Sequence, residues 1–151
     1  MLAANIQIEL LHEDTKVPEI KTIGSAGADL YAYLKKEEEI VIIQPGETKL
    51  IPLGFKTSFS SDFVGLIYAR SGLATKHGLA PANKVGVIDS DYRGEWMVAL
   101  HNHSNEPQVI NHNDRIAQVV FQPVADPIFH IISKVDETAR GEGGFGSTEN
   151  K

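Results

Sequence analysis

The chain has 151 residues, of which 42% are hydrophobic, and it contains no cysteine. This length and apolar content predict one domain with a hydrophobic core, and the lack of cysteine excludes a disulfide framework and thiolate chemistry. The net charge of −6 argues against nonspecific nucleic-acid binding, which needs clustered Lys and Arg. We expect a cytoplasmic protein without a membrane segment, because no apolar run could span a bilayer and residues 1–11 do not resemble a signal peptide.

Short runs rich in β-branched and aromatic residues recur along the chain, separated by turn residues. They predict strands over residues 6–11, 40–43, 48–55, 63–69, 96–100, 113–121 and 129–135, and a strand followed by a loop over residues 107–113. Many short strands at this spacing are typical of an all-β sandwich or barrel. In the run 113–121, alternation places Arg115, Val119 and Phe121 on one face, and Ile116, Gln118 and Val120 on the other.

The segment Gly86–Trp96 holds the densest group of chemically active side chains. Two β-branched residues lead into Asp89-Ser90-Asp91, and an apolar run follows Trp96, so the segment predicts a β-hairpin with carboxylates and Tyr92 near its tip. Such a hairpin is either a polar surface turn or a functional site.

Arginine is scarce, and its positions are informative. Arg70, Arg93, Arg115 and Arg140 each lie in or beside a stretch rich in Gly, Ser, Asp or Asn. Because the guanidinium is suited to phosphate or carboxylate, this placement indicates oxyanion recognition, although four residues are few and Arg is common near turns.

Two further segments allow both a structural and a functional interpretation. Ser71 could cap a short helix ended by Gly78, which is either an ordinary helix or a phosphate-binding turn beside Arg70. Asp29 follows several small residues and enters an apolar segment, where it is either a turn residue or a carboxylate that needs a partner or a metal.

Two other features remain open. His101 and His103 point to the same side of a predicted strand, but a pair without a third ligand is a weak metal signal, and a solvated or subunit-facing role is the alternative. The C-terminal residues 139–151 are rich in Gly and carry Phe145, so they form either a flexible tail or an arm that orders over a ligand.

Five segments, taken in order, closely resemble the five motifs of trimeric dUTP pyrophosphatases. They are residues 26–30 (AGADL), 69–74 (ARSGLA), 86–94 (GVIDSDYRG), 114–118 (DRIAQ) and 140–148 (RGEGGFGST). Each motif alone is weak, but five in this order cover nearly the whole chain. The departures, Ala69 in place of a frequent Pro and Glu149 in place of a frequent Gly, touch no expected chemical role.

The resemblance implies an all-β, jelly-roll-like barrel or sandwich with one short helix. Residues 1–136 would form the barrel, and residues 137–151 would form a flexible Gly-rich arm that closes over the active site within the same domain. It also implies a homotrimer whose active sites are shared between subunits and whose arm reaches a neighbour. No nucleic-acid or membrane partner is expected.

The resemblance further implies hydrolysis of dUTP to dUMP and pyrophosphate, which lowers dUTP and supplies dUMP for dTMP synthesis. Asp89 would activate the water that attacks the α-phosphorus. The backbone of Gly86, Val87 and Ile88, with Asn83, would read the uracil edge, and Tyr92 would pack under the deoxyribose and exclude a 2′-hydroxyl.

By the same resemblance, the remaining site residues would hold the triphosphate and its metal. Asp29 would bind Mg²⁺ through water, and Arg115 would support the phosphate site. Phe145 would stack on uracil when the arm closes. The other substrate contacts would come from Arg70, Ser71, Gly72, Gln118, Arg140, Gly146, Ser147 and Thr148.

Two other functions compete with this assignment. A dCTP deaminase shares the barrel but needs a glutamate where this chain has Ala99, so its general acid/base is missing. The other alternative is a non-catalytic nucleotide-binding trimer, which the presence of Asp29, Asp89 and the complete arm argues against.

Overall fold

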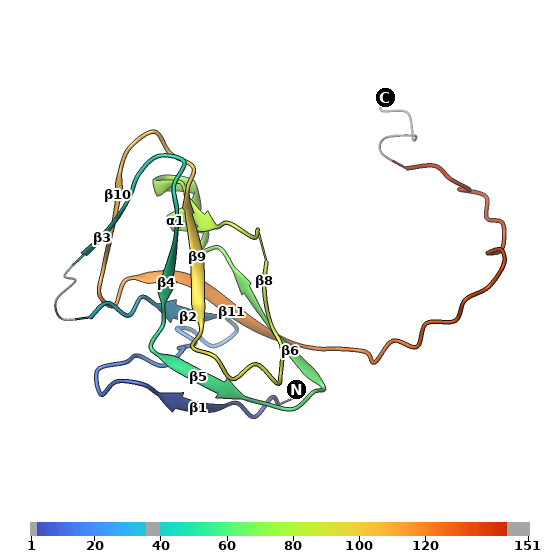
Figure 1. The fold of residues 1–151 in the computed structure, drawn as a ribbon, viewed down its shortest axis with the longest axis horizontal. Coiled ribbons are helices and arrows are strands. Elements are labelled where there is room, and N and C mark those ends of the chain that lie inside the picture. Colours follow the sequence, from blue (N-terminus) through green and yellow to red (C-terminus); the bar gives the residue numbers. More distant parts are fainter. Residues whose placement is uncertain (1–2, 36–39, 145–151) are drawn as a thin grey trace.

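The computed structural model describes residues 3–35 and 40–144. Within these residues the chain forms short strands and one seven-residue helix, so the predicted all-β class is confirmed (Figure 1). The helix is too short to cross a membrane. The elements are β1 (Gln7–Leu10), β2 (Ala28–Tyr31), β3 (Ile40–Ile43), β4 (Thr48–Pro52), β5 (Phe55–Ser58), β6 (Phe63–Tyr68), α1 (Ser71–His77), β7 (Leu79–Pro81), β8 (Gly86–Ile88), β9 (Met97–Asn102), β10 (Gln108–Asn111) and β11 (Arg115–Pro123).

The strands pair antiparallel in four small sheets that pack into a sandwich. The largest has the order β2-β11-β6-β8, a second has the order β4-β9-β7, and β1 pairs with β5 as β3 does with β10. In the described part of the chain the sheets do not close into a barrel, and the arrangement is that of a jelly-roll-like sandwich (Figure 1). β11 is the longest strand, and it holds β2 on one side and β6 on the other.

The core is centred on Trp96, which is fully buried. Its ring lies 5.3 Å from that of Phe55 and 6.3 Å from that of Phe121. The indole N–H donates to the hydroxyl of Thr57 at 2.9 Å, so the one polar group of this side chain is satisfied. A β-carbon at Gly65 would lie 3.2 Å from the Trp96 ring, so the absence of a side chain there leaves space for the indole.

The predicted β-hairpin over Gly86–Trp96 is wrong. β8 pairs with β6, whereas β9 pairs with β4 and β7, so residues 89–96 cross from one sheet to another. The backbone N–H of Trp96 donates to the carbonyl of Phe55 at 3.0 Å, and its indole fills the core. Burial of this large ring draws the end of the segment away from β8.

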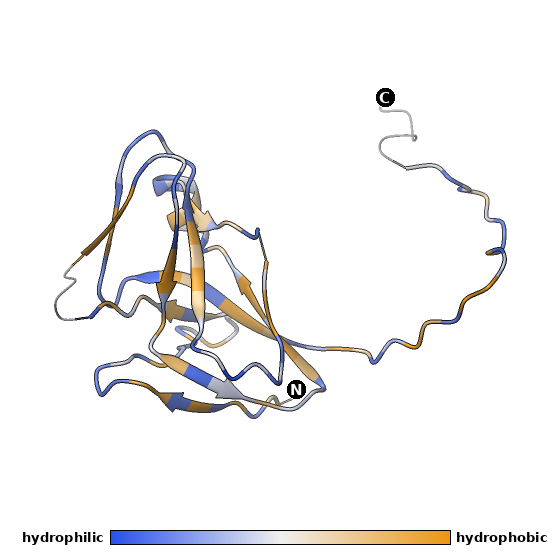
Figure 2. Ribbon diagram, in the orientation of Figure 1, coloured by the Kyte–Doolittle hydropathy of each residue, from blue (hydrophilic) through white to orange (hydrophobic). Residues whose placement is uncertain are grey.

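Two predicted strands also differ from the structure. The run 48–55 is divided at Gly54, whose φ of +76° ends the extended conformation before β5 begins. The predicted strand 129–135 is absent: this segment leaves the body, and Phe129 and Ile131 are 89% and 102% exposed (Figures 1 and 2). Within the described chain no strand offers it the hydrogen bonds that a strand needs.

The predicted alternation in β11 fails at its first residues. The register with β2 shifts between Arg115 and Ala117, which is the signature of a β-bulge. As a result Arg115 is exposed while Ile116 and Ala117 are both buried. Arg115 therefore faces the same cavity as Gln118, instead of sharing a face with Val119.

We expect Trp96→Phe to lower the free energy of unfolding by about 1–3 kcal/mol, because it leaves the buried Thr57 hydroxyl without its partner. The matched comparison is Thr57→Val, alone and combined with Trp96→Phe, each measured by urea unfolding. The double variant should be more stable than the sum of the single effects by roughly 1 kcal/mol. Strictly additive effects would show that this hydrogen bond contributes nothing.

Candidate active site

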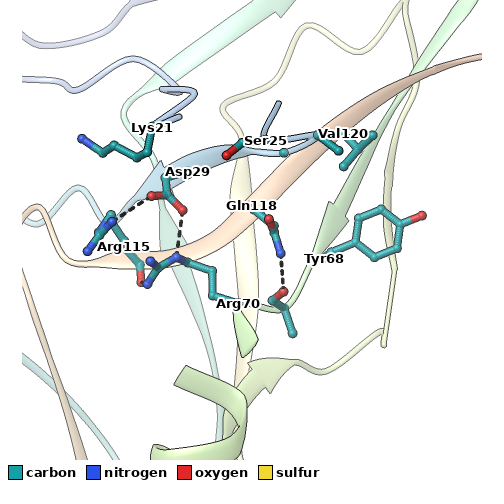
Figure 3. A pocket seen from close by; sticks show the side chains of 11 residues that line it. Lys21, Ser25, Asp29, Tyr68, Arg70, Arg115, Gln118 and Val120 are labelled. Carbon is teal, nitrogen blue, oxygen red and sulfur yellow. Dashed lines mark hydrogen bonds and ion pairs between the residues drawn. The ribbon is translucent and has the colours of Figure 1, made fainter. Parts of the chain in front are cut away.

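A polar cavity of about 600 Å³ lies along one face of the largest sheet (Figure 3). Three segments that are distant in the sequence form it: the turn before β2 with β2 itself, the end of β6, and β11. The lining residues are Lys21, Ser25, Ala26, Gly27, Asp29, Tyr68, Ala69, Arg70, Arg115, Gln118 and Val120.

The register of the sheet explains why these residues meet. Gln118 of β11 stands opposite Asp29 of β2 on one side and opposite Tyr68 of β6 on the other. Residues in register across a sheet have their side chains on the same face. Arg70 follows the end of β6 by two residues. The antiparallel pairing therefore brings together three of the five motif segments, residues 26–30, 69–74 and 114–118.

The carboxylate of Asp29 lies between two guanidinium groups. Arg70 Nε donates to Asp29 Oδ1 at 2.8 Å, and Arg115 Nη1 donates to Oδ2 at 3.1 Å (Figure 3). The Asp29 side chain is only 13% exposed, so these pairs are worth more than typical surface ion pairs. Arg70 Nη1 also donates to the carbonyl of Arg115 at 3.2 Å, which ties the end of β6 to the bulge of β11.

Gln118 is held by the residues on either side of it. Its amide nitrogen donates to the carbonyl of Ala69 at 2.9 Å (Figure 3). On the other side, a β-carbon at Gly27 would lie 2.6 Å from Gln118 Oε1. Any side chain at position 27 would therefore displace the Gln118 amide, which gives a physical reason for glycine in the small-residue motif.

Helix α1 begins directly beside the cavity. The prediction that Ser71 caps it is wrong, because Arg70 holds the N-cap position without a side-chain cap bond and Ser71 is the first helical residue. The predicted end at Gly78 is confirmed, with φ of +64° in the left-handed region. Ser71 and Gly72 thus adjoin Arg70 at the mouth of the cavity but do not line it.

Asp89 lies in a second cavity, of about 320 Å³, that shares no lining residue with the first. Its lining residues are Leu50, Val87, Ile88, Asp89, Tyr92, Glu95 and Met97. The N–H of Tyr92 donates to the carbonyl of Asp89 at 3.2 Å, and the Tyr92 hydroxyl donates to the carbonyl of Glu95 at 3.1 Å. The single chain therefore separates Asp89 from the arginines of the first cavity.

Strand β8 borders this second cavity, because Val87 and Ile88 are among the lining residues. Among the described strands β8 is an edge strand, because it pairs with β6 on one side only. Asn83 lies next to Gly86, where an added β-carbon would be 3.3 Å from the Asn83 amide nitrogen. The side chain of Val87 is 59% exposed.

The C-terminal arm carries the remaining predicted site residues. Arg140 is exposed, and its Nε donates to the carbonyl of Gly143 at 2.8 Å, within the arm itself. The described part of this segment extends away from the body of the fold (Figure 1). Phe145, Gly146, Ser147 and Thr148 lie outside the described residues.

The structure adds residues to the first cavity that the sequence did not indicate: Lys21, Ser25 and Tyr68. Lys21 Nζ donates to Glu19 Oε2 at 2.5 Å, and this bond lowers the pKa of Glu19 and raises the pKa of Lys21 relative to their ordinary values. Lys21 lies in an irregular segment outside the strands, where the sequence has no periodic signal that could indicate its position. Only the pairing of Glu19 with Asp29 shows where Lys21 lies.

The histidine pair forms a separate cluster. The rings of His101 and His103 lie 4.3 Å apart, and the His101 Nδ1 is 2.7 Å from the hydroxyl of Thr48. Within the described residues no group of three His, Cys, Asp or Glu side chains is arranged to hold a metal ion. The two imidazoles thus have no third ligand among residues 3–35 and 40–144.

Known proteins resemble this chain over nearly its full length. A family model described as dUTPase matches residues 13–149. A deoxyuridine 5′-triphosphate nucleotidohydrolase of Desulfitobacterium hafniense is 48% identical over 151 residues, covering 98% of each chain, and one of Haemophilus influenzae is 49% identical over 131 residues, covering 86% of this chain and 85% of that one. The solved structure of the Staphylococcus bacteriophage 80alpha dUTPase with dUPNHPP superposes with a TM-score of 0.80 at 25% identity, over 95% of this chain and 98% of that chain.

Proposed function

Because this chain belongs to the dUTPase family, we propose that it hydrolyses dUTP to dUMP and pyrophosphate. The reaction would lower dUTP and supply dUMP for dTMP synthesis, in the cytoplasm. The observation that carries the proposal is the first cavity, in which Arg70 and Arg115 converge in a protein whose net charge is −6. A polyanion that binds such a protein needs a local concentration of positive charge.

The first cavity is suited to the triphosphate. A guanidinium has five N–H donors, and Arg70 uses its Nε for Asp29 and one Nη1 donor for the carbonyl of Arg115. Its other donors remain available for phosphate oxygens, and the bonds already made hold the group in place before substrate arrives. In our proposal Gln118, Ser71 and Gly72 also contact the triphosphate, and Arg115 supports it from beside Asp29.

Asp89 is proposed as the general base. Its carboxylate would accept a proton from the water that attacks the α-phosphorus, because neutral water is a poor nucleophile. The second cavity holds Asp89 beside Tyr92 and β8, so the base would be placed next to the groups proposed to read the nucleoside.

Uracil and deoxyribose would be recognised at β8. The unpaired side of an edge strand presents N–H and C=O groups that can match the donor and acceptor pattern of the uracil edge. Gly86, Val87, Ile88 and Asn83 are assigned to this contact. The bond from Tyr92 to Glu95 fixes the Tyr92 ring, which would then block the position of a 2′-hydroxyl.

Magnesium would bind together with the nucleotide. Asp29 is the only carboxylate among the residues that line the first cavity, and both of its oxygens already accept from arginines. This donor set fits Mg²⁺ that is held mainly by substrate phosphates and reaches Asp29 through coordinated water. When bound, Mg²⁺ would neutralise part of the triphosphate charge.

A homotrimer with shared active sites would join the two cavities. Three apolar side chains that line the Asp89 cavity are exposed in the single chain: Leu50, Val87 and Met97 are 66%, 59% and 44% exposed. Apolar patches of this kind mark contact surfaces. A second copy seated here could place its arginine cavity opposite Asp89 of the first, which the single chain does not do.

Residues 137–151 are proposed as the arm that closes over the nucleotide, while residues 1–136 form the body of the same domain. Arg140 would bind phosphate, Phe145 would stack on uracil, and Gly146, Ser147 and Thr148 would complete the closure. Among the described residues Arg140 bonds to Gly143 of the arm itself, so phosphate binding by Arg140 would need the arm to move or to reach another copy.

Deamination of dCTP is the chemical alternative, and β9 argues against it. Ala99 stands opposite Leu50 and supplies no carboxylate. Glu95 does line the second cavity, but its Oε1 accepts the backbone N–H of Gly54 at 3.0 Å and is engaged in the fold.

Incubation with dUTP, dCTP and UTP in the presence of Mg²⁺ should release pyrophosphate from dUTP alone, measured by a coupled pyrophosphate assay. Chelation of the metal should reduce the rate. Ammonia release from dCTP would instead establish the deaminase, and absence of any turnover would favour a non-catalytic nucleotide-binding trimer.

Asp89→Asn should lower kcat for dUTP by about 10²- to 10⁴-fold, because the amide cannot take up the proton. Binding of a non-hydrolysable dUTP analogue should change little. Asp91→Asn, two residues away and outside the cavity lining, is the matched control and should retain near-normal kcat. A near-normal rate for Asp89→Asn would remove this residue as the base.

Mixed assemblies test whether the site is shared. Asp89→Asn and Arg70→Ala should each be nearly inactive alone. When the two variants are co-expressed, random trimers should recover about a quarter of wild-type activity, because some sites combine an intact Asp89 from one copy with an intact Arg70 from another. No recovery in mixed trimers of confirmed mass would place each site within one chain.

A further inference from the structure

Lys21 belongs to the first cavity although it lies outside all five motif segments. Two backbone hydrogen bonds between Glu19 and Asp29 fix the segment that carries Lys21. The Asp29 N–H donates to the carbonyl of Glu19 at 2.8 Å, and the Glu19 N–H donates to the carbonyl of Asp29 at 3.2 Å. This bridge places the Glu19–Lys21 segment alongside β2. Lys21 consequently lines the same cavity as Asp29, Arg70 and Arg115 (Figure 3).

The turn after Lys21 is also ordered by hydrogen bonds. The N–H of Ser25 donates to the carbonyl of Thr22 at 3.0 Å, and the two hydroxyls of these residues lie 2.6 Å apart. Gly24 adopts a φ of +97°, which lets the chain reverse toward the small-residue motif. Lys21 thus stands on a backbone tied down on both sides of it.

The Lys21 ammonium has a different carboxylate partner from the guanidiniums of Arg70 and Arg115. Both arginines are bound to Asp29, whereas Lys21 is bound to Glu19, whose Oε2 also accepts from the Tyr31 hydroxyl at 2.9 Å. The hydrogen bond to Glu19 raises the pKa of Lys21, so the ammonium is charged at neutral pH. Among the described residues that line this cavity, Lys21 is therefore the one cation whose charge is not directed at Asp29.

The pair with Glu19 is easily exchanged for a stronger one. The side chains of Lys21 and Glu19 are 42% and 54% exposed, and ion pairs between such exposed side chains contribute little to stability. A triphosphate brings several negative charges and many acceptor oxygens into the cavity. A charge-assisted hydrogen bond from the Lys21 ammonium to a phosphate oxygen would be stronger than its bond to the single exposed carboxylate of Glu19.

We propose that Lys21 is a further substrate-binding residue. When the nucleotide binds, the Lys21 ammonium gives up its bond to Glu19 and contacts phosphate oxygens of the triphosphate. This proposal rests on the proposed function, because it takes dUTP as the ligand of the cavity. Glu19 and Tyr31 position the ammonium in the free protein, and Lys21 supplies the third positive charge of the site. The residue acts in binding and not in proton transfer.

Lys16 provides a matched control. Its Nζ lies 5.0 Å from the centre of the Tyr31 ring and that of Lys21 lies 5.7 Å from it, so the two ammonium groups share a neighbour. Lys16 does not line the cavity. Replacement of either lysine by alanine removes one positive charge from the same region, but only one of the two removes it from the proposed phosphate site.

Steady-state kinetics on the full-length protein distinguishes a specific role of Lys21 in phosphate binding from a general effect of losing one positive charge in this region. Lys21→Ala should raise KM for dUTP about 5- to 20-fold with kcat within about twofold, and Lys21→Arg should recover most of the loss. Lys16→Ala should leave both parameters within about twofold, and thermal unfolding should show that all variants are folded. Equal effects of the two alanine variants, or no effect of Lys21→Ala, would overturn the proposal.

Calorimetric titration with inorganic triphosphate gives a readout that is independent of turnover. The affinity of the protein for inorganic triphosphate should fall about 5- to 20-fold in Lys21→Ala and stay unchanged in Lys16→Ala. If the wild-type protein bound triphosphate in this manner but did not hydrolyse dUTP, the proposed function would fail while the role of Lys21 stood. Unchanged triphosphate affinity in Lys21→Ala would overturn the role of Lys21 even in an active dUTP-hydrolysing enzyme.

Discussion

The ion pairs of Asp29 are the interaction on which the site depends. Its carboxylate is nearly buried and would be unstable there without partners, and Arg70 and Arg115 each supply one. In return the carboxylate holds together two guanidiniums that would otherwise repel each other. One acidic side chain thereby joins β2, the end of β6 and the bulge of β11 into a single basic surface.

The same sheet separates this basic surface from Asp89. Gln118 is in register with Asp29 and Tyr68, so the residues proposed to bind phosphate gather along β11. Asp89 follows the edge strand β8, and the connection after it crosses to another sheet because Trp96 is drawn into the core. The proposed phosphate-binding surface and the proposed base therefore lie apart in the single chain. In the proposed homotrimer, neighbouring copies would bring them together.

The ion pairs at the cavity differ in strength. The exposed pair of Lys21 with Glu19 is the weak one, and in our proposal the triphosphate would replace Glu19 in it. The arginines are fixed by a partly buried carboxylate, while Lys21 is held by an exposed one. Exposed pairs contribute little and are readily given up. In the proposed complex, the Asp29 framework would stay in place while the Lys21 ammonium exchanges Glu19 for a phosphate oxygen, which would let an acidic protein hold a polyanion.

The linear order of residues was sufficient to predict the all-β class, the helix ending at Gly78 and the family, because strand propensity, turn residues and motif order are local properties. It also indicated that Arg70, Arg115, Asp29 and Gln118 act together. It could not show that residues 89–96 cross between sheets, that the bulge turns Arg115 toward Gln118, or that Lys21 enters the cavity. Those outcomes depend on register and on burial of Trp96, and such contacts between distant residues exist only once the chain is folded.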